Sequence, residues 1–581
     1  MGGPASPTNA NGGLALGHRI DIVSYVRSLP ALAAVVVALA QGYSPAPRDI
    51  APVDMKSSCT AEAAVDVNRG AAFLMALAPA DARRAFNRAV EQDPDCALAG
   101  WGRAMSWVPA DPWRMSPQAL REGRDAVRRV AGRGTPREQA YVKSAAALFD
   151  DGGQAPPAAP PVLPVPIGTR LERYRDATRN LAAEYADDQV ATIVFARATL
   201  LLSTVPADDF ASQAATIIER RFGVEFSAGA SSSANPAAST TDSLQLGAAL
   251  TLLLARDGPT LADTAKGAAD GVARMATLPL ARHFPTRTYV RLGEWTAAAA
   301  STEAAITLAG SPASPELVYG MDRRDVAGEW LVEAYLQQGR FAKADALIAE
   351  TRRALDAGVG ADDPAAREAI FDALVRMRVR AVLARAEWTS GLEANARAQG
   401  CDAPSAASCA FMQAYSAARL AWPGAKADRL QEAARVNERL GGVNGGHTSI
   451  VELLRVTVRA AIAAGQEEHQ ELELLLMHSS DLEERLLRSG QLVLPFAPVA
   501  EIAGDLFYQA NRFDQARRRY SDALIARPNR ARSMLGIARA SVRLDDRKAA
   551  ADSYKKFLDA WKDADQDAPE LAEARAFIAK P

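Results

Sequence analysis

One spacing of residues, found near both ends of this 581-residue chain, constrains its fold more than any other feature. The first set is Gly70, Phe73, Ala82, Phe86, Ala89 and Pro94, at intervals of 3, 9, 4, 3 and 5 residues. The second set is Gly504, Phe507, Ala516, Tyr520, Ala523 and Pro528, at the same intervals. A small residue and an aromatic residue one turn apart let a first helix approach a second one closely. The Ala, aromatic, Ala series forms the inner stripe of that second helix, which the proline ends.

Two central segments share a related pattern. Tyr289, Gly293, Trp295 and Ala298 have the same offsets as Tyr335, Gly339, Phe341 and Ala344, and as Phe507, Asn511, Phe513 and Ala516. In each segment Gly or Asn stands where a first helix must end, a position that favours the left-handed backbone conformation. The pattern therefore predicts helix-turn-helix units along most of the chain.

These units, about 34 residues long, resemble the tetratricopeptide repeat (TPR). The resemblance implies an all-α fold, a right-handed superhelical α-solenoid whose first helices line a groove for a protein or peptide partner. On that basis Glu329, Glu333 and Gln337 are expected to be exposed on the groove side of a first helix.

Three segments resemble, more closely, a family of poorly characterised bacterial TPR proteins. They are Asp93 to Met105 with Pro112 and Trp113, His283 to Gly293, and Trp561 to Asp565. The second resembles that family's central His-Met-Pro-Ser-His motif, with Arg287 in place of the second histidine. Only His283 remains of the family's central histidines, so the resemblance implies a degenerate ligand site there at most.

The N-terminus has the features of a secretory signal. Residues 29–40 are apolar, Arg19 and Arg27 precede them, and the run ends in Ala38-Leu39-Ala40. We expect cleavage after Ala40 and a periplasmic or secreted protein with no membrane span in the mature chain. The alternatives are an inner-membrane anchor formed by uncleaved residues 29–40, or a cytoplasmic location.

Composition shifts divide the remaining chain. The expected segments are the leader 1–40, a linker 41–60, an N-terminal array 61–225 with a Pro-rich insert 152–168, a Ser/Ala-rich loop 226–242, a central array 243–400, and a C-terminal region 401–581 with repeats at about 497–562 and a capping helix. Within the last segment, Asp567 is expected to cap the final helix.

The four cysteines form two plausible pairs in an exported protein. Cys59 precedes the first repeat and Cys96 begins the next one, so both are expected at the same edge of neighbouring hairpins. Cys401 and Cys409 flank a turn-rich loop. In the alternative, cytoplasmic case all four are free thiols.

A search for chemistry finds no catalytic or metal-binding motif and implies no cofactor. None of the five histidines forms a pair at helical ligand spacing. Ser553 and Lys556 have an acyl-transfer spacing without its partner motifs, and Asp563, Asp565 and Asp567 lack the glycine that a calcium loop needs. The formal net charge of −2 argues against a nucleic-acid partner.

Three functional hypotheses follow. The first is a non-catalytic TPR scaffold for protein–protein interaction in the bacterial cell envelope. The second is a ligand- or metal-binding protein, or a degenerate enzyme, with a site around His283. The third is a structural array with no partner beyond itself.

Overall fold

The computed structural model describes residues 50–109, 113, 115–150, 165–203, 208–223, 243–256, 262–319, 325–389, 406–424, 426–442, 448–488 and 496–580. Ile50–Pro581 forms one compact unit. The expected leader, the loop 226–242, most of the Pro-rich insert and Cys401 lie outside the described residues.

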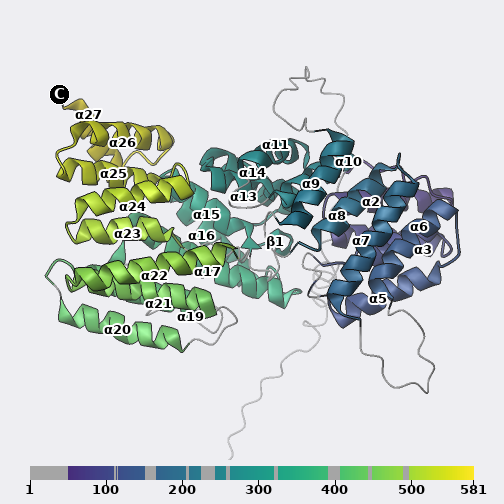
Figure 1. Ribbon diagram of the computed structural model, residues 1–581, viewed down its shortest axis with the longest axis horizontal. Coiled ribbons are helices and arrows are strands. Elements are labelled where there is room, and N and C mark those ends of the chain that lie inside the picture. Colours follow the sequence, from purple (N-terminus) through teal and green to yellow (C-terminus); the bar gives the residue numbers. More distant parts are fainter. Residues whose placement is uncertain are drawn as a thin grey trace, which may run out of the picture. The chain divides into compact units, whose positions relative to one another are not determined.

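Helices make up nearly all of the described chain, and Figure 1 shows them as successive pairs. The N-terminal helices are α2 (Ala61–Met75), α3 (Pro79–Gln92), α4 (Ala97–Met105), α5 (Pro117–Arg129), α6 (Pro136–Phe149), α7 (Ile167–Glu184), α8 (Gln189–Leu200) and α9 (Asp209–Phe222). The central ones are α10 (Ser243–Ala255), α11 (Ala262–Met275), α12 (Pro279–His283), α13 (Pro285–Leu292), α14 (Trp295–Ala309), the short 3-10 helix η2 (Pro315–Leu317), α15 (Ala327–Gln337), α16 (Phe341–Asp356) and α17 (Pro364–Arg385).

The C-terminal helices continue the same arrangement. They are α19 (Ala406–Ala421), α20 (Ala427–Gly441), α21 (Thr448–Gly465), α22 (His469–Arg488), α23 (Val499–Gln509), α24 (Phe513–Ala526), α25 (Ala531–Arg543), α26 (Arg547–Ala560) and α27 (Pro569–Ala579). Each first helix packs on its own second helix and on the next hairpin, as α23, α24, α25 and α26 do (Figure 1). The all-α class and the stacked, TPR-like hairpin architecture are therefore confirmed.

One small departure from the expected helices lies between η2 and α15. Strands β1 (Val318–Tyr319) and β2 (Asp325–Val326) pair antiparallel, with Val318 opposite Val326. Two residues a strand are too few to change the fold class.

The signature residues hold neighbouring hairpins together through their aromatic rings. A Cβ atom on Gly70 would lie 2.8 Å from the ring of Phe86, and Gly102 of the following hairpin contacts the same ring. Tyr520 is related in the same way to Gly504, whose Cβ would lie 2.6 Å away, and to Gly536. Each ring is thus enclosed by the glycines of two successive first helices, where any side chain would push the helices apart.

The turns have the backbone conformation that their sequence predicts. Gly293 and Gly339 have φ angles of 67° and 68°, and Asn511 has a φ of 58°. All three are in the left-handed region where Gly and Asn cost least.

Apolar side chains form three large clusters along the chain. One extends from Ile50 to Ala381, a second from Val379 to Ala540, and a third from Ala531 to Ala574. Part of the expected linker belongs to the first cluster, since Ile50, Val53 and Met55 are buried.

Two further expectations concern helix ends and membranes. The last helix, α27, begins after Ala568 with no side-chain cap, so Asp567 does not cap it. Within the part of the chain that the structure describes, no helix has both the length and the apolar character needed to cross a bilayer.

Candidate functional site

The first-helix side chains expected to line an open groove are buried instead. Glu333 and Gln337 of α15 are each 4% exposed, and the side chain of Glu329 is 12% exposed. The expectation was wrong because these side chains contact partners that are distant in sequence and that the helical pattern of α15 does not reveal.

On one side, α17 supplies two guanidinium groups to the carboxylates of α15. Arg376 lies 2.8 Å from an oxygen of Glu329. Arg380 lies 3.0 Å from the other oxygen of Glu329 and 3.3 Å from Glu333. These pairs are buried, and both carboxylates of α15 are paired with arginines of the neighbouring helix α17.

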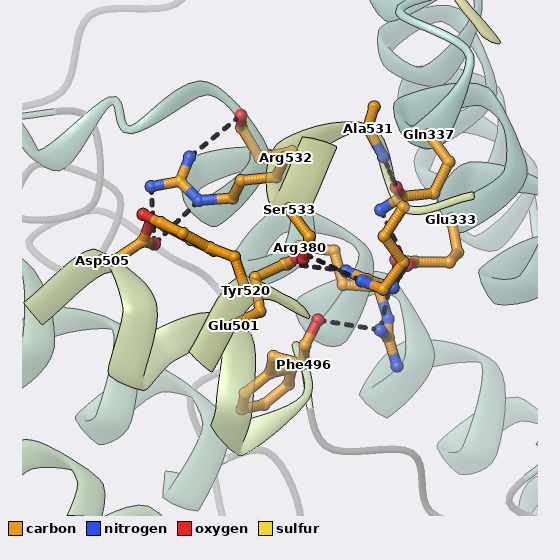
Figure 2. Close-up of polar contacts among 12 residues, drawn as sticks. Glu333, Gln337, Arg380, Phe496, Glu501, Asp505, Tyr520, Ala531, Arg532 and Ser533 are labelled. Carbon is orange, nitrogen blue, oxygen red and sulfur yellow. Dashed lines mark hydrogen bonds and ion pairs between the residues drawn. The ribbon is translucent and has the colours of Figure 1, made fainter. Parts of the chain in front are cut away.

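On the other side, Arg530, the residue before α25, forms the centre of the network. Figure 2 shows Glu333 and Glu501 among the polar contacts of this region. Arg530 contacts both oxygens of Glu501, at 2.8 and 2.9 Å, and also donates to Glu333 at 2.8 Å. Ser533 donates to Glu501 at 2.6 Å, and the backbone N–H of Ala531 donates to Gln337 at 3.0 Å. Central and C-terminal hairpins are therefore joined by charged hydrogen bonds.

The arginines keep the carboxyls of Glu329 and Glu501 ionised. Burial alone would raise the pKa of Glu501, but Arg530 and its hydrogen bonds outweigh burial and hold the pKa below its ordinary value. Burial would also raise the pKa of Glu329, but Arg376 and Arg380 outweigh burial and hold that pKa below its ordinary value. The network is thus a set of charged pairs.

A neighbouring pair extends the network toward α24. Arg532 lies 2.7 Å from Asp505, whose other oxygen accepts a 2.6 Å hydrogen bond from the hydroxyl of Tyr520 (Figure 2). Arg532 also donates to the carbonyl oxygen of Ala384, at the end of α17, at 3.4 Å.

The turns of the central hairpins contact those of the C-terminal hairpins directly. Trp561 donates from Nε1 to the carbonyl oxygen of Gln337 at 3.0 Å, and its ring packs edge-on against Phe341. Asp565 donates from its backbone N–H to Gly339 at 3.0 Å, and its carboxylate accepts the N–H of Ala342 at 2.8 Å. Asp565 therefore satisfies an unpaired donor of the first turn of α16.

We call these contacts the seam. It joins residues 293–342 and 380–384 of the central hairpins to residues 496–532 and 561–565 of the C-terminal hairpins. Its members fill the first-helix side of α15 with other parts of the same chain.

His283, the remaining residue of the motif, lies in the interior between α12 and α14. It is completely buried, and its Nδ1 is 3.1 Å from Thr302 Oγ1, which is itself 2.8 Å from Thr286 Oγ1. Burial, with a smaller contribution from Arg287, lowers the pKa of His283 to about 3. The imidazole of His283 is thus neutral and enclosed by the fold.

No cluster of metal ligands accompanies it. Among the residues described, no group of three or more His, Cys, Asp or Glu side chains is arranged to hold a metal ion. The other motif candidates also have structural roles: Ser553 is buried and donates to Met534 at 2.7 Å, and Asp565 belongs to the seam.

The cysteines at the N-terminal hairpins are joined. Cys59 and Cys96 form a disulfide across 37 residues of sequence, and the adjacent Ser58 donates to Glu138 at 2.6 Å. Cys409 is buried and disulfide-bonded, while its expected partner, Cys401, lies outside the described residues.

A cavity of about 630 Å³ opens among α22, α23, α24 and α25. Its lining residues are Glu473, Met477, Phe507, Gln515, Arg517, Arg518, Arg519, Ser521, Asp522 and Ile537. Met477, which lines the cavity, is 57% exposed, and Leu474, one turn earlier on α22, is 67% exposed. These two side chains give α22 an exposed apolar surface.

The sequence contains a signal for this surface. Leu474, Leu475, Leu476 and Met477 are four consecutive apolar residues. A helix in a two-layer stack buries one stripe at a period of 3.6 residues, so four in a row cannot all face the core. Leu475 and Leu476 are buried, and the two outer residues are exposed.

Comparisons with known proteins find no sequence match and a distant similarity to solved structures. No family model matches the chain, and no curated protein sequence matches it. Among solved structures it is similar to the Cut9–Hcn1 hetero-tetramer of the APC/C, with 11% identity over 87% of this chain and 95% of that chain and a TM-score of 0.27.

Two other solved structures are similar at the same level. Yeast Tom70 shows 10% identity over 89% of this chain and 95% of that chain, with a TM-score of 0.28. The TPR domain of P58(IPK) shows 12% identity over 90% of this chain and all of that chain, with a TM-score of 0.20. Because these TM-scores are low, the TPR-like assignment rests on the chain's own hairpins and turns.

Proposed function

We propose that this protein is a non-catalytic scaffold that binds a protein partner in the bacterial cell envelope. The observation that carries the proposal is the hydrophobic surface of α22, where Leu474 and Met477 are exposed beside the cavity formed with α24 and α25. Stacked helical hairpins commonly present such surfaces to other proteins.

The seam excludes the position first expected for a partner. The first-helix side of α15, where a partner was expected, is filled by Arg530 and Ala531. The α22–α25 cavity is lined by Ile537 and the buried ring of Phe507, and by charged side chains that include the exposed Arg518. An apolar centre with a polar edge is the usual composition of a protein-binding surface.

Two features support the envelope location. The disulfide between Cys59 and Cys96 requires an oxidising compartment in most bacteria. The apolar run 29–40, ending in Ala38-Leu39-Ala40, has the form of a secretory signal. N-terminal sequencing of the protein recovered from the periplasm is expected to start at Gln41.

The binding proposal is tested with charged substitutions. A photo-crosslinking residue at position 518 on α24 is expected to capture a partner in intact cells, and Leu474→Asp with Met477→Asp is expected to abolish that adduct. Val65→Asp is the matched control, because Val65 of α2 is also 67% exposed. Equal capture by the wild-type protein and the α22 double variant would exclude this surface as the binding site.

A further inference from the structure

The seam differs from the contacts inside each stack of hairpins because it is mainly polar. Within the stacks, buried apolar residues form the three large clusters. Across the seam, the ring centroids of Phe341 and Trp561 are 5.5 Å apart, and Val382 and Leu383 of α17 share the second apolar cluster with residues of α23. Charged and backbone hydrogen bonds make up most of the rest.

Each side of the seam also neutralises its own buried charges. On the central side, Glu329 and Glu333 retain Arg376 and Arg380 as partners without any C-terminal residue. On the C-terminal side, Arg530 retains both hydrogen bonds to Glu501. Separation therefore leaves each of these carboxylates paired with a cation. The usual obstacle to opening an interface with charged groups, an unpaired buried charge, does not arise.

Separation would break a limited set of hydrogen bonds. Trp561 would lose Gln337 and Arg532 would lose Ala384. Trp295 would lose Asn529, which would itself lose Gly293. Arg530 would lose Glu333, Ala531 would lose Gln337, and Arg380 would lose the carbonyl oxygen of Phe496. At the turns, Asp565 would lose Gly339 and Ala342. Water can replace all of these partners at the exposed edge of a parted interface.

We infer that the seam is a releasable closure, with the contact between Arg530 and Glu333 as its latch. In the closed state the first-helix side of α15 is occupied by the C-terminal hairpins. In the open state Glu333 and Gln337 face solvent while every hairpin stays folded. This inference is independent of the proposed partner surface, because that surface lies on α22 and α24.

Three backbone amides report on the closure alone. The amides of Ala342 and Ala531 belong to the first turns of α16 and α25, where an N–H has no acceptor in its own helix. The amide of Asp565 lies in the connection between α26 and α27. All three donate across the seam. The amide of Tyr554, inside α26, serves as the reference for unfolding of a hairpin.

The test is native-state hydrogen exchange on the full chain. In the wild type the three seam amides are expected to exchange faster than that of Tyr554, because the seam opens without unfolding. Glu333→Gln removes one charge from the latch and is expected to speed the seam amides by about tenfold, the effect of losing a charged hydrogen bond. The exchange of Tyr554 is expected to stay unchanged.

Glu573→Gln is the matched control, since Glu573 pairs with Arg539 wholly within the C-terminal hairpins. It is expected to leave the amides of Ala342 and Ala531 unchanged. If the seam amides exchange at the same rate as Tyr554 in the wild type, the seam opens only by unfolding and the inference is wrong. The same conclusion follows if Glu333→Gln accelerates Tyr554 as much as the seam amides.

Discussion

The indole Nε1 of Trp295 donates a 2.8 Å hydrogen bond to the carbonyl oxygen of Asn529, 234 residues further along the chain. Asn529 in turn donates to Gly293 at 3.4 Å. Gly293 is close-packed against Pro528, so a side chain there would meet the backbone of the C-terminal turn. The short turn between α13 and α14 thus packs against the turn that follows α24.

Trp295→Phe is expected to destabilise the protein by more than the roughly 0.5–1.5 kcal/mol net value of one hydrogen bond. The donor is lost, and the smaller phenyl ring also leaves buried space that the indole filled. Urea unfolding measures the change. Tyr508→Phe is the control: no hydrogen bond of the Tyr508 hydroxyl is recorded among the described residues, so the loss is expected to be near zero. Equal effects of the two substitutions would argue against a role for the Trp295 donor.

Gly70→Ala and Gly504→Ala are each expected to cost about 1–3 kcal/mol, the usual range for overpacking a close contact. The added methyl groups would lie 2.8 Å from Phe86 and 2.6 Å from Tyr520. Thermal unfolding gives the difference. Gly442→Ala, where the nearest atom is 3.5 Å away, is expected to be tolerated. Tolerance of all three substitutions would contradict the close approach of these helices.

Acid is expected to weaken the protein through Glu501. Its pKa is held below the ordinary value, mainly by Arg530 against the effect of burial, with Ser533 and Arg532 also facing the carboxylate. The stabilisation is therefore present above pH 4.5 and is lost as the pH falls through the lowered pKa, at about 1.4 kcal/mol per pH unit. Urea midpoints between pH 7 and pH 3 measure this slope.

Glu501→Gln is expected to flatten that acid limb. Glu483 provides the contrast, because burial raises its pKa and Arg527 only partly offsets the effect. Its contribution has the opposite sign, since stability is lost as the pH rises through the raised pKa. If Glu501→Gln and Glu483→Gln changed the pH profile in the same direction, the assignment of charges in the network would be wrong.

His283 is expected to remain neutral in the folded protein. Burial lowers its pKa to about 3, so its imidazole resonances should not titrate between pH 8 and pH 5 in an NMR experiment. His283→Ala is expected to leave the metal content of the purified protein unchanged. Stoichiometric metal that this variant loses would instead support the ligand-site hypothesis.

The disulfide between Cys59 and Cys96 is expected to stabilise the N-terminal hairpins. Replacing both residues with serine should cost about 3–4 kcal/mol, the chain-entropy value for a loop of this length. Guanidinium unfolding measures the loss, and thiol titration of the denatured, unreduced protein should find neither cysteine reactive. Reactive thiols at Cys59 and Cys96 would also remove one argument for export.

Local structure was predictable from the sequence where the responsible residues are neighbours. Gly293 and Asn511 indicated the left-handed ends of their first helices, because that preference belongs to the residue itself. The spacing of Ala82 and Phe86 indicated a buried stripe for a similar reason, since both positions lie on one face of one helix.

The burial of Glu333 and Gln337 was not predictable in this way. Their partners, Arg530 and Ala531, are 197 and 194 residues away, and hydrophobic periodicity contains no information on such distances. The hydrophobic pattern predicts that a polar residue on a first helix is exposed, whether it contacts water or another part of the chain. The exposure of Leu474, by contrast, follows from a local feature, because its run of four consecutive apolar residues is wider than one helical stripe.

The contacts of Asp565 with Gly339 and Ala342 limit how a chain of this kind can change in evolution. Open repeat arrays lengthen and shorten readily by duplication or loss of whole units, because each unit touches only its neighbours. Here an added hairpin between α16 and α26 would move Trp561 and Asp565 away from the turn that they contact. Retaining these contacts therefore fixes the number of repeats as well as their sequence.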